Sequence, residues 1–105
     1  MEIQVRTDSH IEGGEKLKDF VKDTVASSLS RFGEQITRVQ VHLQDVNSHK
    51  KRDNDKRCAI EVRVAGIQPL GVSNSDDTVE QALAGALDKL QSRLDTSLGK
   101  LGRRD

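Results

Sequence analysis

Histidine and cysteine side chains are the residues of this 105-residue chain that could ligate a metal or supply a nucleophile with its base. The sequence has three histidines, His10, His42 and His49, and a single cysteine, Cys58. No histidine lies at metal-ligand spacing from another histidine or from Cys58. Cys58 cannot form an internal disulfide, and its apolar surroundings favour the role of a small buried hydrophobe. We therefore expect no metal site, no cofactor and no enzymatic activity.

Two other features could be taken for chemistry. The pair Gly13-Gly14 precedes a predicted helix, and a helix N-terminus can hold an anion. The pair lacks the Walker and dinucleotide-binding patterns, so a simple chain break is the favoured alternative. Carboxylates such as Asp19 share helix faces with Lys16 and Lys22, which is typical of solvated surface pairs. The sequence thus predicts no small-molecule substrate.

The charge distribution contains the strongest signal for a partner. Seventeen basic residues balance seventeen acidic ones, whereas proteins that hold nucleic acid through phosphates usually have a basic surplus. Residues 49–57 (HKKRDNDKR) nevertheless carry five basic and two acidic side chains, and residues 100–105 carry three and one. Between 75 and 99 five acidic residues face two basic ones. The loop 49–57 is either a polyanion site or a solvated loop that Asp53 and Asp55 partly neutralise.

Alternation of apolar and polar residues predicts strands at 2–6, 36–45 and 57–65, and a shorter strand around 70–73. Apolar spacing by threes and fours predicts an amphipathic helix from Glu15 to Phe32, ended by Gly33. That spacing places both Phe20 and Phe32 on the core face of the helix.

A last helix begins at Asp77, which we expect to cap it while Glu80 reaches back in a capping box. A leucine stripe at helical spacing then runs to Leu101. The stripe could be a coiled-coil dimer seam, or one face of a helix packed on a sheet. We favour the packed helix because a single core beside four strands requires such a face.

The predicted fold is therefore α+β, in the order β-α-β-β-β-α, as a single domain over residues 1–105. Two helices cover one face of a four-stranded sheet and the other face meets water. That open face offers Arg6, Arg38, His42 and Arg63 among glutamines but no tyrosine, tryptophan or outward phenylalanine. Base stacking is therefore unavailable, and any RNA contact must be with backbone and shape.

Targeting signals are not evident. No apolar run approaches the roughly 18 residues that a membrane span needs, and the N-terminal MEIQVRTD has neither a basic nor an apolar signal region. We expect a cytoplasmic protein without a membrane partner.

Several segments carry a family resemblance: EKLKDFV in the first helix, RVQVHL in the second strand, and ALDKLQSRL with a later GKL in the last helix. The matching residues are Leu17, Phe20-Val21, Asp88-Lys89-Leu90, Leu94 and Lys100-Leu101. On these residues the chain resembles the short ribosome hibernation-promoting factor and ribosome-associated inhibitor family from residue 1 to 101. The resemblance implies a layout similar to double-stranded-RNA-binding domains. It also implies binding of the small ribosomal subunit between head and body, over the messenger and transfer RNA sites, which silences translation in starved cells. The ribosome-pairing C-terminal domain of longer members is not expected here.

Our leading hypothesis is a translation inhibitor or hibernation factor that docks basic side chains against ribosomal RNA and is a monomer off the ribosome. Lys89 and Lys100 sit where the family has basic residues. The expected rRNA-binding residues are Lys50, Lys51, Arg52, Lys56 and Arg57 in the loop, Lys89, Arg93 and Lys100 on the last helix, and Arg103 and Arg104 in the tail. The alternative is a divergent member that acts as a protein-protein interaction module, which the neutral charge and the acidic last helix favour.

Overall fold

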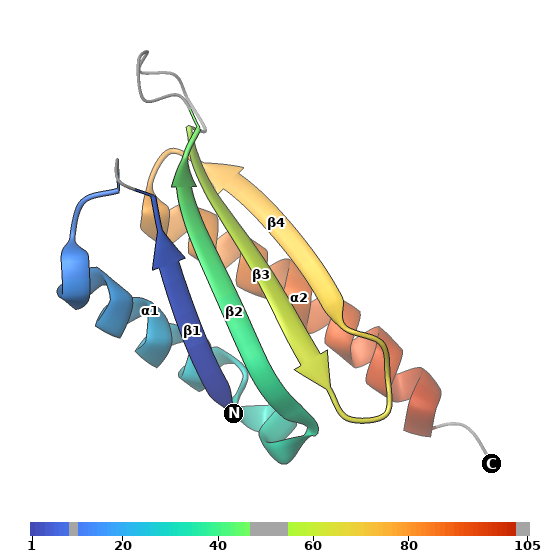
Figure 1. The fold of residues 1–105 in the computed structure, drawn as a ribbon. Coiled ribbons are helices and arrows are strands. Elements are labelled where there is room, and N and C mark those ends of the chain that lie inside the picture. The colour runs from blue at the N-terminus through green and yellow to red at the C-terminus, as the bar shows by residue number, and fades with distance from the viewer. Residues whose placement is uncertain (9–10, 47–54, 103–105) are drawn as a thin grey trace.

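The computed structural model describes residues 1–8, 11–46 and 55–102, with side chains to residue 99. Its elements are, in order, β1 (Glu2–Thr7), α1 (Gly14–Ser28), the 3-10 helix η1 (Ser30–Gln35), β2 (Ile36–Asp45), β3 (Lys56–Val64), β4 (Leu70–Asp76) and α2 (Val79–Gly102). Figure 1 shows both long helices behind a single twisted sheet, whose other face is uncovered. The predicted α+β fold and its β-α-β-β-β-α order are confirmed.

The strands lie side by side in the order in which they occur along the chain. β1 pairs with β2 in parallel, which requires the crossover that α1 provides. β2 with β3, and β3 with β4, are antiparallel pairs. Side chains alternate between the two faces along each strand, so this register decides which polar residues become neighbours on the open face.

The core lies between the sheet and the helices, where α1 packs on β1 and α2 packs on β3 and β4. Inward strand residues such as Val39, Val62 and Cys58 are fully buried. The leucine stripe of α2 meets them: Leu83, Leu87, Leu90 and Leu94 are all at most 3% exposed. In the described part of the chain the stripe thus packs on the protein's own sheet, as the favoured alternative predicted.

The first helix departs from the prediction in two ways. It ends at Ser28 instead of Phe32, and η1 follows, with Gly33 at a φ of 55°. Leu29 and Phe32, on either side of the start of this turn, are both buried in the core. Phe20 was wrongly placed on the core face, because it is 46% exposed. The buried face of α1 is defined by Val21 and Val25, four residues apart.

The start of α2 also differs by one residue. Thr78, not Asp77, caps the helix: its Oγ1 accepts a hydrogen bond from the Gln81 N–H at 3.1 Å. Gln81 takes the place predicted for Glu80, and its side chain meets Thr78 Oγ1 at 3.2 Å. The Asp77 N–H instead donates to the carboxylate of Asp76, at 2.8 Å, where β4 ends three residues later than predicted.

Candidate nucleic-acid interface

The ten predicted rRNA-binding residues divide into those that the structure describes and those outside it. Lys50, Lys51, Arg52, Arg103 and Arg104 lie outside the described residues. Lys100 lies in α2, without a described side chain. The structure therefore places four of the ten side chains: those of Lys56, Arg57, Lys89 and Arg93. They do not form one cluster, because they occupy β3 and α2 on opposite sides of the core.

Lys56 opens β3 and is engaged within the protein. Its ammonium lies 3.0 Å from a carboxylate oxygen of Asp55 and 3.5 Å from one of Asp45. All three side chains are less than one-third exposed. The hydrogen bond with Asp55, followed by the charge of Asp45, raises the pKa of Lys56 above its usual value. Lys56 therefore ties the end of β2 to the start of β3, and its charge is balanced by two carboxylates.

Lys89 and Arg93 stand one turn apart on α2 and reach around to β4. The Lys89 ammonium donates to the backbone carbonyl of Ser73 at 2.9 Å, and the Arg93 guanidinium donates to that of Gly71. β4 is an edge strand, so these carbonyls have no neighbouring strand to pair with. A carbonyl is neutral, and among the described residues neither cation has an ion-pair partner, so both charges remain uncompensated there while the side chains are held in place.

Asp95, the acidic residue nearest to Arg93 on α2, has its own partner. Both of its carboxylate oxygens accept hydrogen bonds from the Arg31 guanidinium of η1, at 2.7 and 2.9 Å. The hydrogen bond lowers the pKa of Asp95 and raises that of Arg31. The guanidinium also lies 4.2 Å from the centre of the Phe32 ring. The pair neutralises both charges and docks η1 on α2.

A small depression of about 220 Å³ lies on α2 around Arg93. Its other lining residues carry hydroxyl groups: Ser92, Thr96 and Ser97. Hydroxyl and guanidinium groups are common partners of phosphate oxygens in protein–nucleic-acid contacts. This part of α2 therefore combines an uncompensated cation with hydrogen-bond donors.

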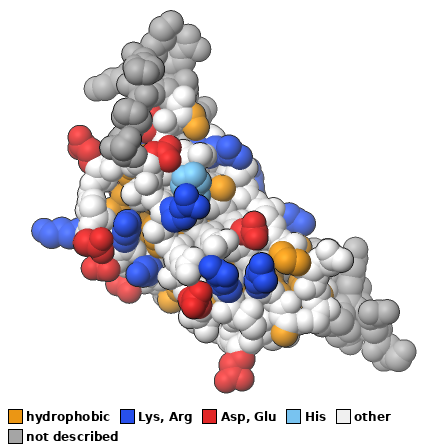
Figure 2. Space-filling model, in the orientation of Figure 1, with side chains coloured by type: hydrophobic (Ala, Val, Ile, Leu, Met, Phe, Trp, Pro, Cys, Tyr) orange, Lys and Arg blue, Asp and Glu red, His pale blue; other side chains and the backbone are white. Residues whose placement is uncertain are grey.

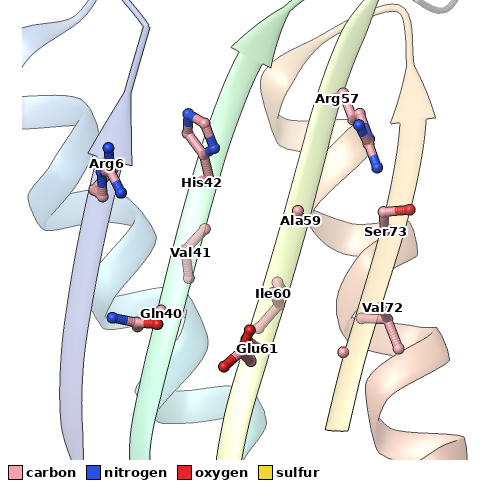
Figure 3. A pocket seen from close by; sticks show the side chains of 11 residues that line it. Arg6, Gln40, Val41, His42, Arg57, Ala59, Ile60, Glu61, Val72 and Ser73 are labelled. Atoms are coloured by element: carbon pink, nitrogen blue, oxygen red, sulfur yellow. The ribbon is translucent and has the colours of Figure 1, made fainter.

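Figure 2 views the open face of the sheet, where basic and acidic side chains are interspersed with uncharged surface. A wider depression of about 420 Å³ lies on this face, and Arg57 lines it together with Arg6 and His42 (Figure 3). Arg6 and His42 were noted from the sequence as open-face residues, but their association with Arg57 was not. Strand pairing brings the three together, and alternation within one strand carries no signal for pairing.

Two further features bear on chemistry. Cys58 is fully buried, and burial raises the pKa of its thiol to about 12. Among the described residues, no three histidine, cysteine, aspartate or glutamate side chains are grouped so that they could hold a metal ion. In the same part of the chain no helix is long and apolar enough to cross a membrane.

The sequence from residue 3 to residue 101 matches the model of the family described as sigma 54 modulation protein / S30EA ribosomal protein. The chain belongs to this family. The resemblance inferred from the helix and strand segments is thereby confirmed, and it makes this S30EA-family chain one of a group of ribosome-associated factors. No curated protein matches the sequence.

Solved structures support the fold of the S30EA-family chain. The N-terminal domain of Protein Y from Thermus thermophilus superposes with a TM-score of 0.71 at 20% identity, over 91% of this chain and 98% of that one. A ribosomal subunit interface protein from Coxiella burnetii gives a TM-score of 0.72 at 12% identity, over 94% and 99%. At such identities the likeness concerns the arrangement of strands and helices.

Proposed function

We propose that this S30EA-family protein is a translation inhibitor or hibernation factor that binds the small ribosomal subunit and blocks the channel of messenger and transfer RNA. The observation that carries the proposal is the family match over residues 3–101, nearly the whole chain. The names of the two structural neighbours, Protein Y and a ribosomal subunit interface protein, agree with it. The action is steric, so it needs no catalytic group.

The electrostatics of the described residues support contact with phosphates at selected points. Lys89 and Arg93 are bonded to neutral carbonyls, so their charges stay available to a phosphate. Arg93 also has hydroxyl neighbours on α2. The remaining proposed contacts are Arg57 on the sheet, Lys56 beside it, Lys100, and the loop and tail residues Lys50, Lys51, Arg52, Arg103 and Arg104. Prepositioned side chains lose less conformational entropy on binding than free ones.

Co-sedimentation with purified small subunits tests the proposal, in roughly 100 mM salt and again at several-fold higher salt. We expect saturable binding that weakens sharply with salt and that transfer RNA competes away. Absence of binding at both salt concentrations would overturn the proposal.

The second candidate is a protein-interaction module in a cytoplasmic complex. The observation that favours it is the internal neutralisation of basic residues: Lys56 by two aspartates, Arg31 by Asp95, and Arg38 by Glu2 at 3.4 Å. With a formal net charge of zero, such pairing leaves fewer cations for RNA. Retention on immobilised RNA or heparin at low salt separates the two candidates, because a protein-only module would not be retained.

A further inference from the structure

The depression on the open face of the sheet, called the sheet depression below, is a second cationic site of the molecule. It is built from three neighbouring strands and the edge strand β4. Figure 3 shows Arg6, His42 and Arg57 toward one end and Gln40 and Glu61 toward the other, with Ala59 between them. Its lining residues are Arg6, Gln40, Val41, His42, Arg57, Ala59, Ile60, Glu61, Gly71, Val72 and Ser73.

Strand register explains its shape. Arg6 pairs with His42, His42 with Ala59, and Ala59 with Ser73, which makes one row across all four strands. The next row runs from Gln40 through Glu61 to Gly71. Long side chains stand on β1 and β2 and at the two ends of the hollow on β3, whereas Ala59, Ser73 and Gly71 form the floor between β3 and β4. The absence of bulk over that floor produces the hollow.

The charges in the sheet depression differ from those of the ion-paired residues elsewhere on the protein. Within the described part of the chain, neither Arg6 nor Arg57 has a hydrogen bond or ion pair, in contrast to Arg31, Arg38 and Lys56. His42 lies 3.2 Å from the carboxylate of Asp8, and Glu61 lies at the far end of the hollow. One end thus presents two uncompensated guanidinium groups, and the other presents an amide and a carboxylate that accept hydrogen bonds.

We propose that the sheet depression binds the ribose-phosphate backbone of a single RNA strand. A phosphate sits among Arg6, His42 and Arg57, and ribose hydroxyls donate to Glu61 and Gln40. The two rows are two residues apart, about 7 Å along a strand, so a phosphate at the row of Arg6 and His42 places the adjoining ribose over the row of Gln40 and Glu61. No phenylalanine, tyrosine or tryptophan lines the depression, so we expect the contact to be with backbone and largely independent of base sequence.

This inference rests on the proposed function for its choice of RNA as the ligand. It adds a second RNA-binding face to the one proposed on α2. The sheet depression lies on the open side of the sheet, whereas the depression around Arg93 lies on α2 behind it; the Arg93 guanidinium itself reaches the carbonyl of Gly71 at the β4 edge. The protein would then contact RNA on two sides, as a body inserted between two RNA walls does. An acidic peptide is the competing occupant, and competition with polyglutamate tests for it.

The test uses fluorescence anisotropy with a short labelled oligouridylate and with an oligodeoxythymidylate of the same length. Arg57→Glu is compared with Arg63→Glu, a matched control with the same charge change on the same strand and face but outside the depression. We expect R57E to weaken oligouridylate binding roughly tenfold or more, and R63E to change it only slightly. Arg6→Ala leaves one guanidinium in the depression. It should reduce the steepness of the plot of log association constant against log salt concentration by about 0.7, because one phosphate contact is lost.

Thermal melts confirm first that each variant is folded. The wild type should prefer the ribose probe, and Glu61→Ala should reduce that preference. The inference would be overturned if R57E and R63E lost oligouridylate affinity equally, or if neither lost any. It would also be overturned if polyglutamate displaced the oligouridylate and R57E bound the oligouridylate with undiminished affinity. If wild-type protein sediments with small subunits while R57E and R63E behave alike, the proposed function stands and the second face does not. If the wild-type protein does not bind small subunits but R57E still loses oligouridylate affinity, the RNA site in the sheet depression stands and the proposed function does not.

Discussion

The side chain of Asn74 on β4 lies directly against the backbone of α2 at Gly85. Asn74 points toward the helices, and its Nδ2 donates to the carbonyl of Ala82 at 3.3 Å. A Cβ atom at Gly85 would lie 2.1 Å from that Nδ2. Glycine at this position therefore lets the helix approach the strand closely enough for the hydrogen bond.

Replacing Gly85 with alanine should destabilise the fold even though alanine favours helices. The new methyl group either displaces Asn74 from the Ala82 carbonyl or moves α2 off the sheet, and overpacking of this kind costs about 1–3 kcal/mol. Urea denaturation would measure the loss. Gly99→Ala is the matched control on the same helix, because a Cβ there meets nothing within 4 Å. G99A should be neutral or stabilising by up to about 1 kcal/mol, and equal effects of the two variants would refute the contact.

Lys56→Met should lower stability at neutral pH, because it removes the ammonium that contacts the carboxylates of both Asp45 and Asp55. These side chains are partly exposed, so we expect about 1–2 kcal/mol, less than for a fully buried pair. The raised pKa of Lys56 means that its contribution is complete below the usual value of 10.5 and is lost as pH rises through the higher folded value. The difference in free energy of unfolding between wild type and K56M should therefore be constant through neutral pH and shrink only above about pH 10.5.

The control for this prediction is Lys22→Met on α1, which removes the same charge from an exposed side chain. Melting temperatures at several pH values compare the two variants. If K22M and K56M lower the melting temperature equally, the change in net charge is responsible rather than the loss of the Asp45–Lys56–Asp55 contact.

Cys58 should be inert to thiol reagents in the native protein. Its pKa of about 12 keeps the thiol protonated at pH 8, and full burial denies access. A disulfide reagent should modify one thiol rapidly in denaturant and only at the rate of unfolding in buffer. Cys58→Ala supplies the blank. Fast labelling of the folded protein would show that β3 opens locally.

Charge reversal tests whether residues 49–57 contact ribosomal RNA. Reversal of Lys50, Lys51 and Arg52 to glutamate should weaken binding to small subunits and flatten its salt dependence, because fewer counterions are released. Reversal of Lys16, Lys18 and Lys22 on α1 is a control with the same change in net charge. An unchanged salt slope in the loop variant, or equal losses in both, would count against the loop as the contact.

The strands and helices were predictable because their signals are local. Alternation along β2 and β3 and the leucine stripe of α2 record which side of each element is buried. Where local signals compete, the predicted position of a cap or of a buried residue was wrong, although the element itself was predicted correctly. Thr78 and Asp77 are both good caps, and only the end of β4 decides between them. Phe20 has helical spacing to other apolar residues, but the position of α1 on β1 leaves it outside the core.

The sequence by itself determined the element order, the buried faces of the strands and of the last helix, and the family of this protein, because periodicity and segment similarity need no knowledge of what lies opposite. Only the tertiary structure decided which charges remain available. Arg31 and Asp95 are far apart in sequence yet neutralise each other, while Arg6 and Arg57 converge on one hollow without a carboxylate partner in the part of the chain that is described. Such outcomes depend on register and helix docking, and electrostatic effects between side chains act over distances that only the folded chain defines.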